Sequence, residues 1–144
     1  MDKNIHYDYN ETEGRSICDI KYKDLIFTGI AYCHPDDRDF NSERTGLFIA
    51  ECRAVIKVLE FQRDFEIKPV LATLNHLYGN MKTSKNYNPK SYEAKMLRSQ
   101  IRHWEKELAA AKADLAIERT NLKTYIVEKD KIYTKLRAKS KQLS

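Results

Sequence analysis

The pattern of apolar residues is most regular in the C-terminal part of the chain, where it predicts one long helix. After Pro89 the sequence contains no glycine and no further proline, and apolar positions recur at spacings of three and four residues. This heptad spacing keeps one stripe of a supercoiled helix facing a partner helix. The stripe, here called the seam, comprises Leu97, Ile101, Trp104, Leu108, Ala111, Leu115, Glu118, Leu122, Tyr125, Lys129, Ile132, Leu136, Lys139 and Leu143.

The seam predicts self-association, because an isolated helix would leave its apolar stripe in water. We expect a coiled coil between copies of the chain, with contacts from Leu97, Ile101, Trp104, Leu108, Leu115, Leu122, Tyr125, Ile132 and Leu136. Trp, Tyr and Ala at alternate core positions leave the number and the direction of the helices open. The alternative is a hairpin of two shorter helices that folds back near Thr120 and Asn121, although no glycine or proline marks such a turn.

The pattern in the first part of the chain is different and predicts strands followed by helices. Residues 16–33 are β-branched and aromatic around a polar Lys23-Asp24 turn, which indicates a β-hairpin, and Gly29 within it indicates a bulge or a close backbone approach. Residues 1–14 are polar and predict a mobile lead-in or an irregular edge strand. A helix is expected from Asn41 or Ser42 to about Phe65, since either side chain can cap its first turn.

A second, shorter helix is expected from about Lys68 and Pro69 to Gly79, with the glycine as its C-terminal cap. Residues 80–88 are polar and predict a linker, and Asn88-Pro89 then caps and opens the long helix. The predicted fold class is therefore α+β and predominantly α, with a small N-terminal β-hairpin plus helices followed by a long coiled-coil helix. The predicted division is a head domain at 1–79, the linker at 80–88 and the oligomerisation segment at 89–144.

Charge is distributed unevenly along the chain, which carries a formal net charge of +5. Residues 1–66 hold 9 Lys and Arg against 14 Asp and Glu, a net −5, whereas residues 67–144 hold 17 against 7, a net +10. An acidic half can mimic nucleic acid or bind a basic surface, and a basic half can attract nucleic acid or an acidic protein. Segment 82–102 is the strongest candidate for phosphate contact, because its lysines and arginines alternate with Tyr87 and Tyr92.

Signatures of catalysis, of cofactor binding and of metal binding are missing from the sequence. Its three cysteines have unrelated spacings, which argues against a disulfide framework and suits a reducing cytoplasm. Residues 37–48 begin like a calcium loop, but Ser42 replaces the turn glycine and Phe48 replaces the bidentate glutamate. No nucleophile elbow, phosphate-binding glycine loop or zinc-binding histidine motif occurs. We therefore expect no enzyme activity, no cofactor and no metal.

Membrane and secretion signals are also missing, because no stretch of 18 apolar residues and no signal-peptide pattern is found. A cytoplasmic protein is the expectation.

One segment carries a run of residues typical of a particular group of proteins. These residues are Gly29, Ala31, Cys33, His34, Pro35, Asp37, Glu43, Arg44, Thr45, Gly46, Ile49, Ala50, Arg53 and Ala54. Their pattern resembles that of small phage and prophage accessory proteins of Gram-positive bacteria. The resemblance implies an accessory or early phage protein in a bacterial host, and it transfers no particular activity.

Together these features predict a non-enzymatic, oligomeric accessory protein that acts by stoichiometric binding. The expected target is a host defence protein or a host nucleic-acid-processing protein, which the binding would inhibit. A direct DNA-binding or RNA-binding protein is the first alternative, and an architectural phage component is the second. The expected partner-binding residues are Asp36, Asp37, Asp39, Arg44 and Arg53 in the head and Lys85, Lys90, Arg98 and Arg102 around the start of the long helix.

Overall fold

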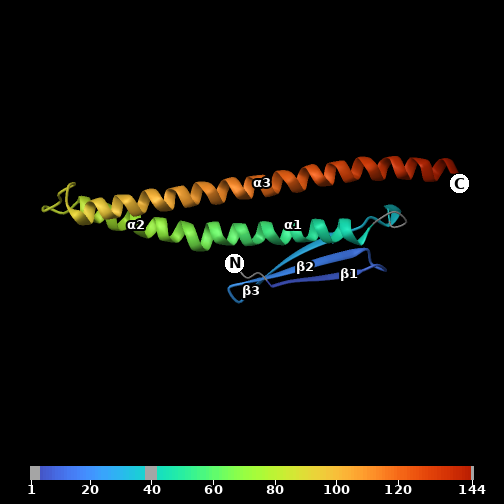
Figure 1. Ribbon diagram of the computed structural model, residues 1–144, viewed down its shortest axis with the longest axis horizontal. Coiled ribbons are helices and arrows are strands. Elements are labelled where there is room, and N and C mark those ends of the chain that lie inside the picture. The colour runs from blue at the N-terminus through green and yellow to red at the C-terminus, as the bar shows by residue number, and fades with distance from the viewer. Residues whose placement is uncertain (1–3, 38–41, 144) are drawn as a thin grey trace. The chain divides into compact units, whose positions relative to one another are not determined.

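The computed structural model describes residues 4–37 and 42–143, which form an α+β fold with mostly helical content (Figure 1). Its elements, in order, are β1 (Asn4–Asn10), β2 (Arg15–Tyr22), β3 (Leu25–Tyr32), the 3₁₀ turn η1 (Pro35–Asp37), α1 (Glu43–Phe61), the π-helix η2 (Gln62–Ile67), α2 (Lys68–Lys82) and α3 (Tyr92–Leu143). The predicted α+β class, predominantly α, and the long C-terminal helix are confirmed, whereas the coiled-coil part of the prediction stays a prediction. The unbroken α3 excludes the alternative hairpin at Thr120 and Asn121.

The three strands form one antiparallel sheet in the order β1-β2-β3. The predicted turn between β2 and β3 is confirmed, since Lys23 and Asp24 have φ values of 49° and 63°. Two consecutive positive φ values are typical of the type I′ turns whose twist matches that of the flanking strands. Within the polar N-terminal segment, residues 4–10 form a regular edge strand, and Tyr7 of β1 lies opposite Cys18 of β2.

Helical structure runs from Glu43 to Lys82 without the predicted break near Phe65. Pro69 explains why the middle of this stretch is a π-helix: a proline has no N–H to donate, and its ring clashes with the carbonyl four residues earlier in an α-helix. The prediction that Gly79 ends the second helix is wrong. Gly79 lies inside α2, which continues to Lys82.

The chain clusters into two compact units, and α1 and α3 each contribute residues to both. The first unit contains residues up to Val58 together with residues from Ala116 onward. The second unit contains Leu59–Leu115. These units do not follow the predicted boundaries at residues 79 and 89.

In the first unit, one face of the sheet packs against α1 at very short range. Every second residue of β2, from Ser16 to Tyr22, is buried on this face. A side chain at Gly29 of β3 would collide with the backbone of Ala50 and Ala54 in α1, so only glycine allows this approach. The C-terminal part of α3 contacts α1 as well, since the rings of Phe48 and Tyr125 lie 4.4 Å apart.

In the second unit, α2 and the first half of α3 form a helical hairpin whose connection spans residues 83–91. Ala94, Ile101 and Leu115 of α3 are its buried apolar residues. The helix α3 starts at Tyr92, and its cap is Ser91, whose hydroxyl accepts a hydrogen bond from the N–H of Ala94 at 3.2 Å. The predicted cap at Asn88 is therefore wrong; that side chain instead accepts a hydrogen bond from the N–H of Lys90.

The seam of α3 is covered within the single chain at most of its positions. Ile101 and Leu115 are buried, and the half-buried seam residues are Leu97, Trp104, Leu108, Ala111, Glu118, Leu122, Tyr125, Lys129 and Leu136. Ile132 is 56% exposed, because the neighbouring Tyr133 takes the inward position and is only 7% exposed. The coiled coil between copies stays a prediction, and the apolar stripe has partners in its own chain without one.

Candidate functional site

Asp36 and Asp37, two of the acidic residues predicted to bind a partner, belong to η1, which follows β3. Asp37 is buried, and one of its carboxylate oxygens lies 3.2 Å from Nε of Arg137 in α3. This ion pair occupies the carboxylate with a residue of the same chain and removes it from the surface. Asp39 and the side chain of Asp36 lie outside the described residues.

Arg53 has an internal role that the sequence did not reveal. Its Nη1 donates a hydrogen bond of 2.6 Å to the carbonyl oxygen of Ile30, and Nζ of Lys57 donates one of 2.5 Å to the carbonyl oxygen of Thr28. Both carbonyls belong to β3, an edge strand of the sheet. Two cations of α1 therefore satisfy backbone acceptors along this edge, which is one way that proteins prevent further strands from adding.

Arg44 is exposed and lies beside a surface groove between β1 and α1. The groove has a volume of about 300 Å³ and is lined by Tyr7, Arg44, Leu47, Phe48 and Glu51. The hydroxyl of Tyr7 donates a hydrogen bond of 3.1 Å to the carboxylate of Glu51. The pKa of Tyr7 is raised, mainly because the side chain is partly buried and also because of its contact with Glu51.

The basic residues predicted to bind a partner gather at one end of the helical hairpin in the second unit. The exposed cations here are Lys82, Lys85, Lys90, Lys95 and Arg102, and we call them the basic patch. They come from the last turn of α2, from the connection 83–91 and from the first turns of α3. Between Pro69 and Arg102 the chain holds six Lys and Arg and a single acidic residue, Glu93. The charge of this hairpin end is therefore strongly positive.

Arg98, which is predicted to contact a partner, holds the connection in place. Its Nη2 donates a hydrogen bond of 2.7 Å to the carbonyl oxygen of Pro89, and its Nη1 donates one of 3.3 Å to the hydroxyl of Tyr78 in α2. The hydroxyls of Tyr78 and Tyr87 lie 3.1 Å apart. One arginine thus joins α2, the connection and α3.

The electrostatics of this tyrosine and arginine cluster follow from its contacts. The hydrogen bond from Arg98 lowers the pKa of Tyr78, and the hydrogen bond shared with Tyr78 raises the pKa of Tyr87. Nζ of Lys82 lies 4.9 Å from the centre of the Tyr78 ring, a cation–π distance. The cluster fixes the backbone from which Lys85 and Lys90 project, so these lysines lose less conformational freedom on binding than lysines of an unrestrained loop would.

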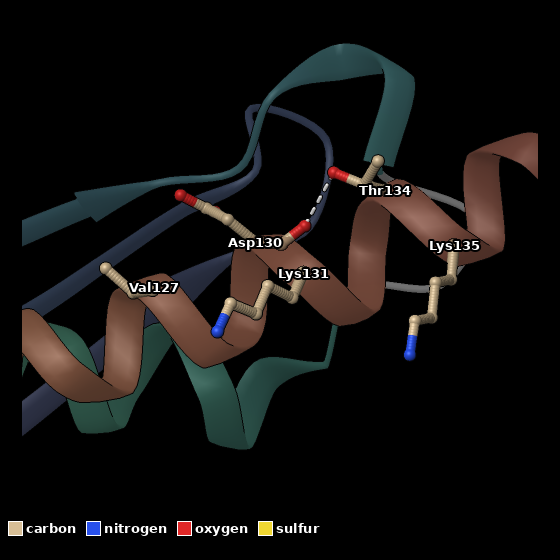
Figure 2. A pocket seen from close by; sticks show the side chains of 5 residues that line it. All are labelled: Val127, Asp130, Lys131, Thr134 and Lys135. Atoms are coloured by element: carbon tan, nitrogen blue, oxygen red, sulfur yellow. Dashed lines mark hydrogen bonds between the residues drawn. The ribbon is translucent and has the colours of Figure 1, made fainter.

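A second surface hollow of about 490 Å³ lies on α3 in the first unit (Figure 2). Its lining includes Val127, Asp130, Lys131, Thr134 and Lys135. Lys131 and Lys135 project from one side of the helix, while the hydroxyl of Thr134 donates to the carbonyl oxygen of Asp130 on the other (Figure 2). The charges are mixed, and Lys131 pairs with Glu128 at 3.3 Å. This arrangement selects no particular ligand chemistry.

Metal and thiol chemistry find little support in the described residues. Within residues 4–37 and 42–143, no three His, Cys, Asp or Glu side chains gather as a metal site requires. Cys18 is fully buried, and burial raises the pKa of its thiol to about 11. Burial also raises the pKa of the Cys52 thiol. Both thiols are therefore poor nucleophiles at neutral pH.

Comparisons with known proteins add no further information about the site. No protein family profile, no curated protein and no solved structure matches this chain. None of the helices in the described part of the chain combines the length and the apolar character needed to cross a bilayer.

Proposed function

We propose that this protein is a non-catalytic nucleic-acid-binding protein whose basic patch contacts the phosphate backbone. The observation that carries the proposal is the position of five exposed cations around one hairpin end with a single acidic neighbour. Lysine and arginine neutralise phosphates and release the counterions condensed on nucleic acid, which supplies most sequence-independent affinity. Such binding needs no catalytic group and no cofactor.

The state of the other predicted binding residues favours this function over a purely protein-directed one. Asp37 and Arg53 bind other parts of the first unit, so the expected acidic and basic head surface loses two of its members. The basic patch keeps Lys85, Lys90 and Arg102 exposed. Tyr92, beside the patch, is 69% exposed and offers an aromatic face on which an unpaired base can stack.

A pair of charge-matched variants tests the proposal. The variant K85Q/K90Q/K95Q removes three cations of the patch, and the control K123Q/K135Q/K139Q removes three exposed lysines from the C-terminal part of α3. Both variants lose the same net charge. Fluorescence anisotropy with labelled duplex and single-stranded oligonucleotides at low salt should show at least a tenfold weaker affinity for the first variant and little change for the control. Equal losses in both variants would mean diffuse attraction by net charge and would contradict the patch.

Inhibition of a host defence protein or nucleic-acid-processing protein is the second candidate function. The phage-like segment between Thr28 and Ala54 favours it, and so does the exposed Arg44 beside the groove on α1. The salt dependence of nucleic-acid binding distinguishes the two candidate functions. If the wild-type chain binds no nucleic acid at moderate ionic strength, the protein-directed function is preferred, and the chain should then reduce the activity of a purified host nuclease at equimolar ratio.

A further inference from the structure

The two edges of the sheet differ in their contacts with the rest of the chain. Arg53 and Lys57 bind carbonyl oxygens of β3, as described above. On the opposite edge, β1 pairs only with β2 among the described residues (Figure 1). Its seven residues include no proline and no lysine, two residues that often protect an edge strand, and Asn4 to Asp8 are exposed. This edge is therefore open to another strand.

The sequence of β1 is complementary to itself when two copies run antiparallel. The strand reads Asn4, Ile5, His6, Tyr7, Asp8, Tyr9, Asn10. A two-fold axis at Tyr7 places His6 opposite Asp8 of a second copy, and Ile5 opposite Tyr9 of that copy. The charged or polar groups then meet on one face of the sheet and the apolar groups on the other, because side chains alternate along a strand. The two Asn residues at the ends meet as an amide pair.

The groove beside α1 lies where the apolar side chains of an added strand would be. Tyr7 is on the face of the sheet that α1 covers, as its hydrogen bond to Glu51 shows, so Ile5 and Tyr9 are on that face too. The groove includes Leu47 and Phe48, and Phe48 is 44% exposed. A second copy of β1 on this edge would bring its own Ile5, Tyr7 and Tyr9 to the groove and cover this apolar surface.

We infer that the chain forms a two-fold dimer in which β1 pairs with β1 of a second copy, centred on Tyr7. The partner is a second copy of the same chain. In this register His6 of each copy faces Asp8 of the other, and apolar residues face apolar residues, so both copies make the same contacts, as a two-fold interface requires. The inference is independent of the basic patch, which belongs to the second unit. It also differs from the predicted coiled coil, since it uses the sheet edge and leaves the seam inside the chain.

Two lysine substitutions test the register. Lysine at position 6 would face Asp8 of the second copy, whereas lysine at position 8 would face His6. His6→Lys should therefore tighten the dimer about two- to fivefold, and Asp8→Lys should weaken it about five- to tenfold, since each dimer contains two such cross-strand pairs. Sedimentation equilibrium of the full chain measures both. Ile26→Glu, on the other edge strand and 67% exposed, is the control and should change nothing.

Both lysine variants make the chain more positive, so general repulsion would weaken the dimer in both. Opposite directions support the inferred register, and weakening in both contradicts it. A chain that stays monomeric at every accessible concentration contradicts the dimer itself. Circular dichroism confirms that each variant is folded before the comparison is made.

Cysteine pairing gives a second readout that does not depend on charge. In the variant H6C/D8C, each new cysteine lies opposite one of the second copy, within the Cα separation of about 4.4–6.8 Å that disulfides need. In either single variant the two equivalent cysteines are two residues out of register, about 8 Å apart. Mild oxidation should give a reducible dimer in the double variant only. The wild-type chain reports any background from the three native cysteines, and equal cross-linking in the single variants would overturn the register.

Discussion

Gly29 provides the sharpest test of how the sheet and α1 pack in the first unit. A Cβ atom added at this position would lie 1.9 Å from the carbonyl oxygen of Ala50 and 2.5 Å from the backbone nitrogen of Ala54. Ordinary contacts of a Cβ atom begin at 3.4 Å, so Gly29→Ala must displace α1 by roughly 1 Å or more. Both opposing atoms belong to the helix backbone and cannot rotate away.

The expected cost follows from two opposing effects. Overpacking a close interface usually costs about 1–3 kcal/mol, and replacing a glycine stabilises a chain by about 0.4–1 kcal/mol through the unfolded state. We expect the substitution to lower the free energy of unfolding by about 2–2.6 kcal/mol, because a backbone contact lies at the upper end of the overpacking range, about 3 kcal/mol, and the effect on the unfolded state offsets about 0.4–1 kcal/mol of it.

Urea unfolding followed by circular dichroism measures the change, and Gly79→Ala is the matched control. Gly79 lies within α2 and an added Cβ would have no atom within 4 Å, so alanine should stabilise the chain by about 0.5–1 kcal/mol through its helix propensity. The two identical substitutions should thus have effects of opposite sign. A neutral or stabilising Gly29→Ala would refute the close approach of β3 to α1.

Three further predictions follow from buried and charged groups. Arg137→Met should destabilise the chain by about 1–3 kcal/mol, because it leaves the buried carboxylate of Asp37 without its cation. Asp37→Asn should destabilise it less in thermal melts, because the guanidinium of Arg137 can remain hydrated when the carboxylate is removed. The hydrogen bond from Arg63 lowers the pKa of Asp64 from 3.8 to about 2. The stability that the ionised Asp64 contributes should therefore be present above about pH 4 and be lost as the pH falls through about 2. Melting temperatures of wild type and Asp64→Asn should therefore converge at low pH, and a constant difference would count against this pairing. Cys18 is fully buried and its thiol has a raised pKa, so it should react with a thiol reagent at pH 8 only as fast as the chain unfolds. Mass spectrometry of labelled peptides measures this rate, and fast labelling of the native chain would contradict the burial of this thiol.

Local structure was predictable from the sequence wherever nearby residues determine it. The Lys23-Asp24 turn was recognised. Ser42 was one of the two caps of α1 that the pattern left open, and it accepts a hydrogen bond from the N–H of Thr45. The steric role of Gly29 was one of two interpretations that the pattern left open. Prediction of Gly79 as a helix cap failed, because a glycine tolerates α-helical backbone angles as well as left-handed ones and its sequence position alone does not distinguish them.

Contacts between distant parts of the chain were not predictable. Arg98 was interpreted as a binding residue, but it bonds to Tyr78, twenty residues away. Asp37 pairs with Arg137 across a separation of one hundred residues. A heptad pattern indicates that a helix has an apolar stripe, but it does not identify which residues or which chain cover that stripe. For the same reason, the seam alone does not determine whether other copies of the chain or α1 and α2 cover it.

The salt dependence of nucleic-acid binding tests the central claim most directly. If the five cations of the basic patch make three to five phosphate contacts, a plot of log K against log salt concentration for duplex DNA should have a slope of about −2.7 to −4.5, at about −0.9 for each contact. The variant K85Q/K90Q/K95Q should make this slope shallower by about 2 to 3, because each lost contact removes about 0.9. A slope near zero, or one that the triple substitution leaves unchanged, would contradict phosphate binding at this end of the hairpin.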